Sequence, residues 1–207
     1  MNLKKLEEAE SYFLELYPEG FNDVGLLPII KRHNTAKLGE QAKAMFAKEN
    51  FTQPDLICEN FAKIASKSTL ISLFEKPKIR EMVKSMRMER KDMLCIGLYE
   101  MLYGDLEEGF DIVLEVLLAY QLAKWSIVTL IPYYVHREKF FFIKPTTTKN
   151  IIAFFELEEL VYKPRPSYEF YVAYTKALET MKSKSSKKVK HDDNAYFTGF
   201  LMMTMEE

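Results

Sequence analysis

The stretch of residues 105–119 reads DLEEGFDIVLEVLLA and gives the clearest indication of an α-helical fold. Its apolar side chains recur at the spacing of one helix face, at Phe110, Val113, Leu114 and Leu117. Asp105 and Glu108 stand three residues apart at its start, as in a capping box that opens a helix. Beyond Val116 the stretch is apolar on nearly every side, which predicts a central, buried helix.

The helical spacing continues on both sides of this stretch. Apolar stripes predict helices near residues 3–16, 36–49, 57–64, 79–86, 94–102, 147–157, 167–182 and 194–205. Thr52 and Asp55 have the spacing of a second capping box, ahead of the third of these helices. Only seven glycines interrupt 207 residues. The sequence therefore predicts a compact all-α fold.

Residues 138–166 differ from the rest of the chain in their residue composition. The runs 140–143 and 160–162 are rich in strand-favouring side chains, and each ends in Lys-Pro, which favours extended backbone. Two interpretations stay open at this point. The runs pair into one very small two-stranded sheet near residues 140–163, or they are merely extended connectors between helices.

The chain length suits one domain, and we expect a single helical domain over residues 1–207. Residues 183–192 are polar, basic and without apolar periodicity, so we expect a flexible, exposed loop there. The last helix, about residues 194–205, should dock back onto the body through its apolar side chains.

Composition limits the compartment and the partners. Hydrophobic residues make up 48% of the chain and the net charge is −1, so nothing draws the whole molecule to nucleic acid or to a membrane. The start of the chain lacks the apolar run of a signal peptide, and charges interrupt the apolar stretch 112–135. Cys58 and Cys95 lie in apolar stretches, as buried thiols do. We expect a cytoplasmic protein without nucleic-acid or membrane partners.

Charge is nevertheless segregated along the chain. Residues 76–91 carry seven bases and two acids, whereas residues 92–123 carry seven acids and no base. A basic helix of this kind can contact phosphates or an acidic protein. Two adjacent helices of opposite charge can also neutralise each other, within the chain or across a dimer, and we favour this interpretation.

The sequence contains few recognisable catalytic or metal-binding motifs. His33, His136 and His191 have no second ligand at a metal-binding spacing, and the common nucleotide-binding and nucleophile motifs are missing. Asp111 and Glu115 share a helix face, as an acid–base pair would, but a solvated helix face is the better explanation. We therefore assign no catalytic residue, metal site or cofactor.

The segment after residue 143 is the best candidate for a ligand site. At the start of the helix predicted there, free amides and the helix dipole attract anions, and Lys144, Thr146 and Thr147 add a cation and hydroxyl donors. Lys163 and Arg165 would join them if the two short runs pair in parallel. Alternatively, a threonine caps the helix and the lysines are solvated.

Aromatic residues offer a second candidate surface. Six of them fall on predicted helices or their ends: Trp125, Tyr133, Tyr134, Tyr168, Tyr171 and Tyr174. They could line a stacking surface, although aromatic side chains at this spacing usually pack in a core.

Two functions from different classes follow from these observations. The first is a non-enzymatic helical module that binds a protein partner or forms a homo-oligomer through its charged and aromatic faces. The second is a small-molecule or nucleotide-binding enzyme that holds a small anionic ligand at the helix start after Pro145. The lack of recognisable catalytic motifs favours the non-enzymatic module.

Overall fold

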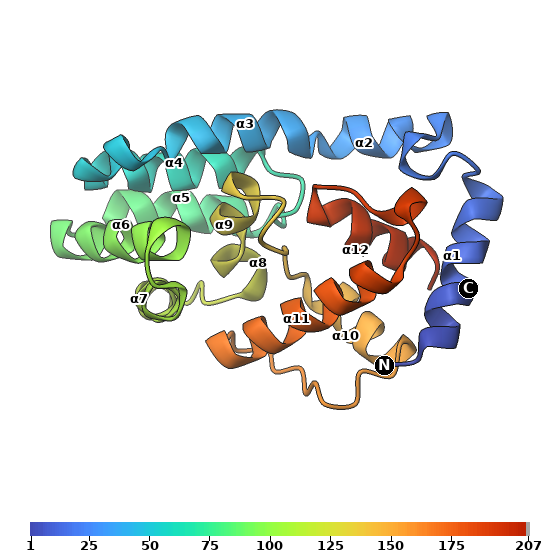
Figure 1. The fold of residues 1–207 in the computed structure, drawn as a ribbon. Coiled ribbons are helices and arrows are strands. Elements are labelled where there is room, and N and C mark those ends of the chain that lie inside the picture. Colours follow the sequence, from blue (N-terminus) through green and yellow to red (C-terminus); the bar gives the residue numbers. More distant parts are fainter. Residues whose placement is uncertain (206–207) are drawn as a thin grey trace.

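The computed structural model describes residues 1–205, and every regular element among them is helical (Figure 1). The first half contains α1 (Leu3–Leu16), α2 (Leu27–His33), α3 (Thr35–Met45), α4 (Pro54–Lys67), α5 (Glu75–Ser85) and α6 (Met88–Tyr103). The second half contains α7 (Leu106–Ala119), α8 (Trp125–Val128), α9 (Leu130–Val135), α10 (Pro145–Phe154), α11 (Tyr168–Lys184) and α12 (Asn194–Met203). Short 3₁₀ turns are η1 (Gly20–Asn22), η2 (Val24–Leu26), η3 (Lys48–Thr52) and η4 (Lys187–Val189). The predicted all-α fold is confirmed, and residues 206–207 of the predicted domain lie outside the described part.

The helices form two groups that α2 and α3 join along one edge (Figure 1). Helices α3 to α9 lie on one side, and α1, α10, α11 and α12 lie on the other. Asn34 forms the joint between α2 and α3 in a left-handed backbone conformation, with φ of 46°. Asparagine tolerates this conformation better than most side chains. As a result α2 extends past α3 and lies alongside α12.

Residues 105–119 form α7 together with its N-cap residue, Asp105. The Asp105 side chain accepts a hydrogen bond from the Glu108 amide, so the predicted cap is confirmed. The return bond differs from a capping box, because the Asp105 amide donates to Glu100 and not to Glu108. The predicted burial is confirmed at Val116 and Leu117, which are 0% exposed, but not at Leu118, which is 40% exposed.

Helix α7 packs closely on α6. A Cβ atom on Gly97 of α6 would lie 2.9 Å from the Val113 side chain of α7, which is closer than real contacts allow. Glycine at this position therefore lets the two backbones approach.

The second predicted capping box does not form. Helix α4 begins at Pro54, with Gln53 as its N-cap residue, and the Thr52 hydroxyl donates to the Glu49 carbonyl instead. Proline suits the first position of a helix because it has no amide hydrogen to leave unpaired.

The proposed two-stranded sheet is wrong, because no strand occurs among residues 1–205. The extended segment after α9 is bonded by side chains instead. The Ile143 amide donates to Thr129 Oγ1 at 3.1 Å, and the Asn194 side chain donates to the Phe140 carbonyl at 3.3 Å. Thr129, between α8 and α9, and Asn194, at the start of α12, thus supply the partners that a second strand would have supplied.

The basic segment 183–192 is not fully exposed. Ser185 and Val189 are buried, the latter completely, and the Ser186 amide donates to the Glu10 carboxylate of α1 at 3.0 Å. Lys188 Nζ donates to the Pro18 carbonyl at 2.9 Å. The expected exposure of this loop is therefore wrong at Ser185 and Val189.

The predicted aromatic surface lies inside the protein. Five of its six members are buried: Trp125, Tyr133, Tyr134, Tyr171 and Tyr174. Trp125 Nε1 donates to the Lys163 carbonyl at 2.8 Å, which satisfies its polar atom. The interpretation as core packing is confirmed.

Candidate ligand pocket

A pocket of about 230 Å³ lies between α2, α10 and α12. Most of its lining is apolar: Phe21, Leu26, Ile29, Ile30, Leu70, Phe142, Met202 and Met203. Its volume falls slightly below the roughly 300–1,000 Å³ of typical ligand pockets. The pocket therefore suits a compact ligand.

Small side chains on α12 create the hollow. Ala195 and Gly199 both line the pocket and lie four residues apart on one face of this helix. A Cβ atom on Gly199 would meet no atom within 4 Å. The pocket thus has open space where a larger residue would otherwise fill the face of the helix.

Polar groups gather at one side of the pocket. Lys144, Thr147 and Thr148 come from the start of α10, and His33 comes from the end of α2. Lys144 is exposed and, in the described part of the chain, forms no ion pair. Thr148 is buried beside Tyr174, whose pKa is raised chiefly by its own burial. A ligand would meet one positive charge and several hydroxyl groups.

His33 lies close enough to Lys144 for their charges to interact. Its Nδ1 is 2.8 Å from the Thr69 hydroxyl. The pKa of His33 is lowered, first by burial and then by the positive charges of Arg32 and Lys144. His33 is therefore neutral at pH 7, and Lys144 carries the positive charge among the lining residues.

The predicted anion-site residues are only partly brought together. Lys144 and Thr147 line the pocket, whereas Thr146, Lys163 and Arg165 are exposed and do not line it. The reason for placing Lys163 and Arg165 beside Lys144 was the paired strands, which are absent from the described residues.

The alternative interpretation is confirmed for the lysines, since Lys144 and Lys163 are exposed, but the threonine cap that it expected does not form. Lys144 is the N-cap residue of α10, and its side chain makes no capping hydrogen bond. Thr147 Oγ1 instead lies 3.7 Å from the Met202 sulfur, so it contacts α12.

Sequence reasoning missed two walls of the pocket, on α2 and α12. The available signal was weak: a glycine within an otherwise apolar helix, four residues after an alanine. Such spacing also occurs where two helices pack closely, so it does not by itself indicate a cavity.

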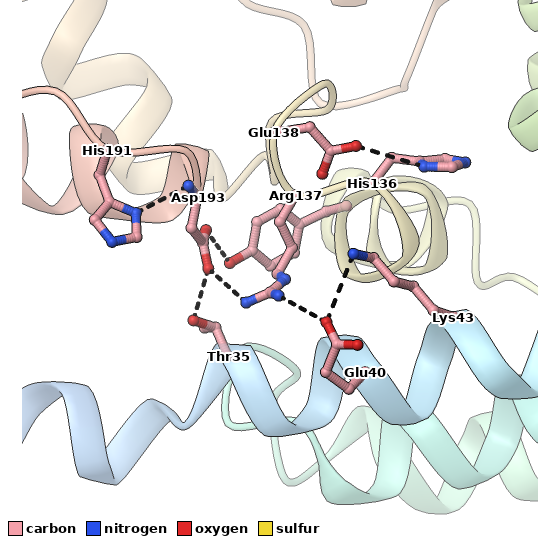
Figure 2. A network of polar contacts seen from close by, with 9 residues as sticks. Thr35, Glu40, Lys43, His136, Arg137, Glu138, His191 and Asp193 are labelled. Atoms are coloured by element: carbon pink, nitrogen blue, oxygen red, sulfur yellow. Dashed lines mark hydrogen bonds and ion pairs between the residues drawn. The ribbon is translucent and has the colours of Figure 1, made fainter.

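A polar cluster around Asp193 lies next to the pocket (Figure 2). Asp193 is the N-cap of α12 and is 4% exposed. Its Oδ1 accepts hydrogen bonds from Tyr133 OH and the Ala195 amide, both at 2.9 Å. Its Oδ2 accepts from Thr35 Oγ1 at 2.8 Å and from Arg137 at 3.3 Å. Four donors therefore saturate one carboxylate.

Arg137 extends the cluster to α3 (Figure 2). Its second terminal nitrogen donates to Glu40 at 3.3 Å, and its guanidinium lies against Gly39, where a Cβ atom would collide with it. The cluster thus joins α3, α9 and α12. Because Asp193 has no free acceptor site, we interpret the cluster as structural and not as an acid–base centre.

The segregated charges neutralise each other only in part. Arg90 pairs with Glu115 of the acidic stretch at 3.0 Å, whereas Lys91 pairs at 2.6 Å with Asp55 of α4, which lies outside that stretch. Lys78 and Lys84 of α5 are exposed and form no ion pair within residues 1–205. The outer face of α5 therefore keeps its positive charge.

The structure gives no sign of catalytic activation at Glu115, Cys58 or Cys95. Glu115 is exposed and paired with Arg90, as expected for a solvated face. Cys58 and Cys95 are buried free thiols, and burial raises their pKa to about 12 and about 11. Neither thiol ionises near neutral pH, so neither is an activated nucleophile.

Comparison of the chain with protein-family models, curated proteins and solved structures finds no match. Within residues 1–205, no three His, Cys, Asp or Glu side chains are grouped as metal ligands would be. Over the same residues, no helix combines the length and the apolar character needed to cross a bilayer.

Proposed function

We propose that this protein is a non-enzymatic binding module for a small amphipathic anion, a compact apolar group that ends in a carboxylate. The supporting observation is the apolar pocket between α2, α10 and α12, with Lys144 at its polar side. This proposal keeps the predicted binding role and the predicted anion site. It replaces the protein partner that we expected to bind at an aromatic face, because those aromatic side chains are buried.

The lining favours an apolar body for the ligand. Aliphatic and aromatic side chains and two methionines surround the space, and each buried methylene group stabilises a complex by about 0.8 kcal/mol. Methionine side chains also adapt their shape to different ligands.

The polar side favours a negative end. Lys144 has no carboxylate partner in the described residues, and the start of α10 leaves backbone amides after Pro145 without a partner in the helix, as every helix start does. Neutral His33 adds no second charge, although it can donate or accept a hydrogen bond. A single carboxylate therefore matches the charge of the site.

Three probes separate the contributions of the apolar body and the charge. In isothermal titration calorimetry we expect octanoate to bind. Octanol should bind about tenfold more weakly, because it lacks the charge and charge-assisted hydrogen bonds contribute about 1.5–3 kcal/mol. Inorganic phosphate should bind least, because it has no apolar body. Equal affinity for octanol and octanoate would refute the role of Lys144. Equal affinity for phosphate and octanoate would indicate a simple anion site.

Lys144→Met removes the charge and keeps an apolar stem. We expect it to lower octanoate affinity by about tenfold and to leave octanol binding unchanged. The matched control is Lys149→Met, which removes an exposed lysine of the same helix that does not line the pocket.

Gly199→Leu tests the pocket itself. The added side chain would extend from the pocket-lining face of α12 into open space, so it should abolish octanoate binding and leave the fold intact. Gly199→Ala is the control for the backbone change. Binding that survives Gly199→Leu in a folded protein would place the ligand elsewhere.

A further inference from the structure

The segment between α4 and α5 presents two large apolar side chains to solvent. Leu73 is 77% exposed and Phe74 is 85% exposed, the two highest values among the large apolar residues described. Both lie directly before Glu75, the first residue of α5. Exposing an adjacent pair of this size is unfavourable in water unless something covers it.

The residues just before this tip are firmly held. Ser68 is buried and its hydroxyl lies 2.9 Å from Tyr134 OH, while Ile71 is buried in the core. The Phe74 amide lies 3.3 Å from Ser72 Oγ, to which it donates. The structure therefore presents Leu73 and Phe74 from an anchored base.

The surroundings of the tip are cationic. Lys78 stands one helical turn after Phe74, and Arg80, Lys84 and Arg87 continue the exposed bases along α5 and just beyond it. One exposed carboxylate, Glu81, lies among them. The nearest acid to the tip, Glu75, is neutralised by Lys124 at 2.7 Å.

We propose that the tip of Leu73 and Phe74, together with the basic face of α5, docks the protein onto an anionic lipid surface. The two apolar side chains would insert among the lipid chains, and the bases would contact the headgroups. This inference goes beyond the proposed ligand pocket and does not depend on it. It departs from our expectation of no membrane partner, which was based on the net charge and on the interrupted apolar stretch 112–135 and not on this local patch.

A second copy of this chain fits the surface less well. Two side chains bury far less than the roughly 800 Å² per partner of a stable interface. Two copies meeting at this tip would also place like charges against each other, whereas anionic headgroups attract them. Nucleic acid would satisfy the bases and leave Leu73 and Phe74 exposed.

Vesicle co-sedimentation of the full chain tests the proposal. We expect binding to phosphatidylcholine vesicles that contain phosphatidylserine, little binding to pure phosphatidylcholine, and weaker binding as salt is raised. Replacing both Leu73 and Phe74 with serine should reduce binding by about tenfold or more, because the inserted apolar area is lost.

Matched controls separate the patch from general effects. Leu16→Ser changes a 51%-exposed apolar residue on α1, at the opposite edge of the molecule from α5, and should leave binding unchanged (Figure 1). Lys78→Glu combined with Lys84→Glu should reduce binding by about tenfold. Lys37→Glu combined with Lys184→Glu makes the same change in net charge elsewhere and should have a small effect.

Three results would overturn the proposal. The wild-type protein could fail to bind phosphatidylserine vesicles at low salt. The Leu73→Ser, Phe74→Ser variant could bind as well as wild type while remaining helical by circular dichroism. Sedimentation velocity could show a self-association that this variant abolishes, which would identify a second copy as the partner.

Discussion

At the scale of single residues, Asp193 has the largest predicted effect on stability. Asp193→Asn keeps the size of the side chain but removes the charge opposite Arg137 and turns an amide group toward hydrogen-bond donors. We expect the free energy of unfolding to fall by about 3 kcal/mol, as measured by urea denaturation. Asp192→Asn changes the exposed neighbour and should cost little; similar losses in both variants would contradict this account.

The three histidines predict a dependence of stability on pH. Burial is the main cause that lowers the pKa of His33, His136 and His191 from the ordinary 6.5. Below pH 6.5 the unfolded chain therefore binds more protons than the folded chain, so stability decreases as the pH falls. Above pH 6.5 this contribution is fully retained.

Urea denaturation at pH 7.5 and pH 5.5 measures this change. His191 Nδ1 accepts a hydrogen bond from the Asp193 amide at 2.9 Å, which requires an unprotonated nitrogen. His191→Gln should therefore weaken the dependence on pH. An identical dependence in wild type and variant would show that His191 does not contribute.

At the scale of elements, the N-cap of α7 gives a defined prediction. Asp105→Ala removes the acceptor for the Glu108 amide, and we expect a loss of about 1 kcal/mol in the free energy of unfolding. Asp111→Ala removes an exposed carboxylate within the same helix and should change stability much less. Equal losses would indicate a general charge effect.

The elements also show where sequence reasoning worked and where it could not. Helical periodicity is a local property, so the stripe through Phe110 and Val113 was enough to predict α7. The run at 140–143 favours strand locally, but its backbone partners come from Thr129 and Asn194, which only the tertiary structure brings near. For the same reason the sequence indicated Lys144 as a candidate but gave only a weak signal for Gly199, which lines the same pocket.

At the scale of the whole molecule, the cluster around Asp193 connects the two groups of helices. We therefore expect one cooperative unfolding transition and not two. Trp125, the single tryptophan, lies in α8 and packs against Phe170 of α11 at a centroid distance of 5.2 Å, so its fluorescence reports on the contact between the two groups, whereas far-ultraviolet circular dichroism reports on all helices. The two urea curves should coincide. Separated midpoints would divide the chain into two units and contradict the predicted single domain.

The exposed position of helix α2 affects how readily this helix opens locally. None of its residues is buried, yet Ile29, Ile30 and His33 form one wall of the pocket. Few packed contacts oppose the transient opening of such a helix. In hydrogen–deuterium exchange, the amides of residues 30–33 should therefore exchange faster than those of α3 beyond Asn34, and octanoate should slow them. The protection that octanoate adds to α2 would measure how strongly the bound ligand opposes the local opening of this helix.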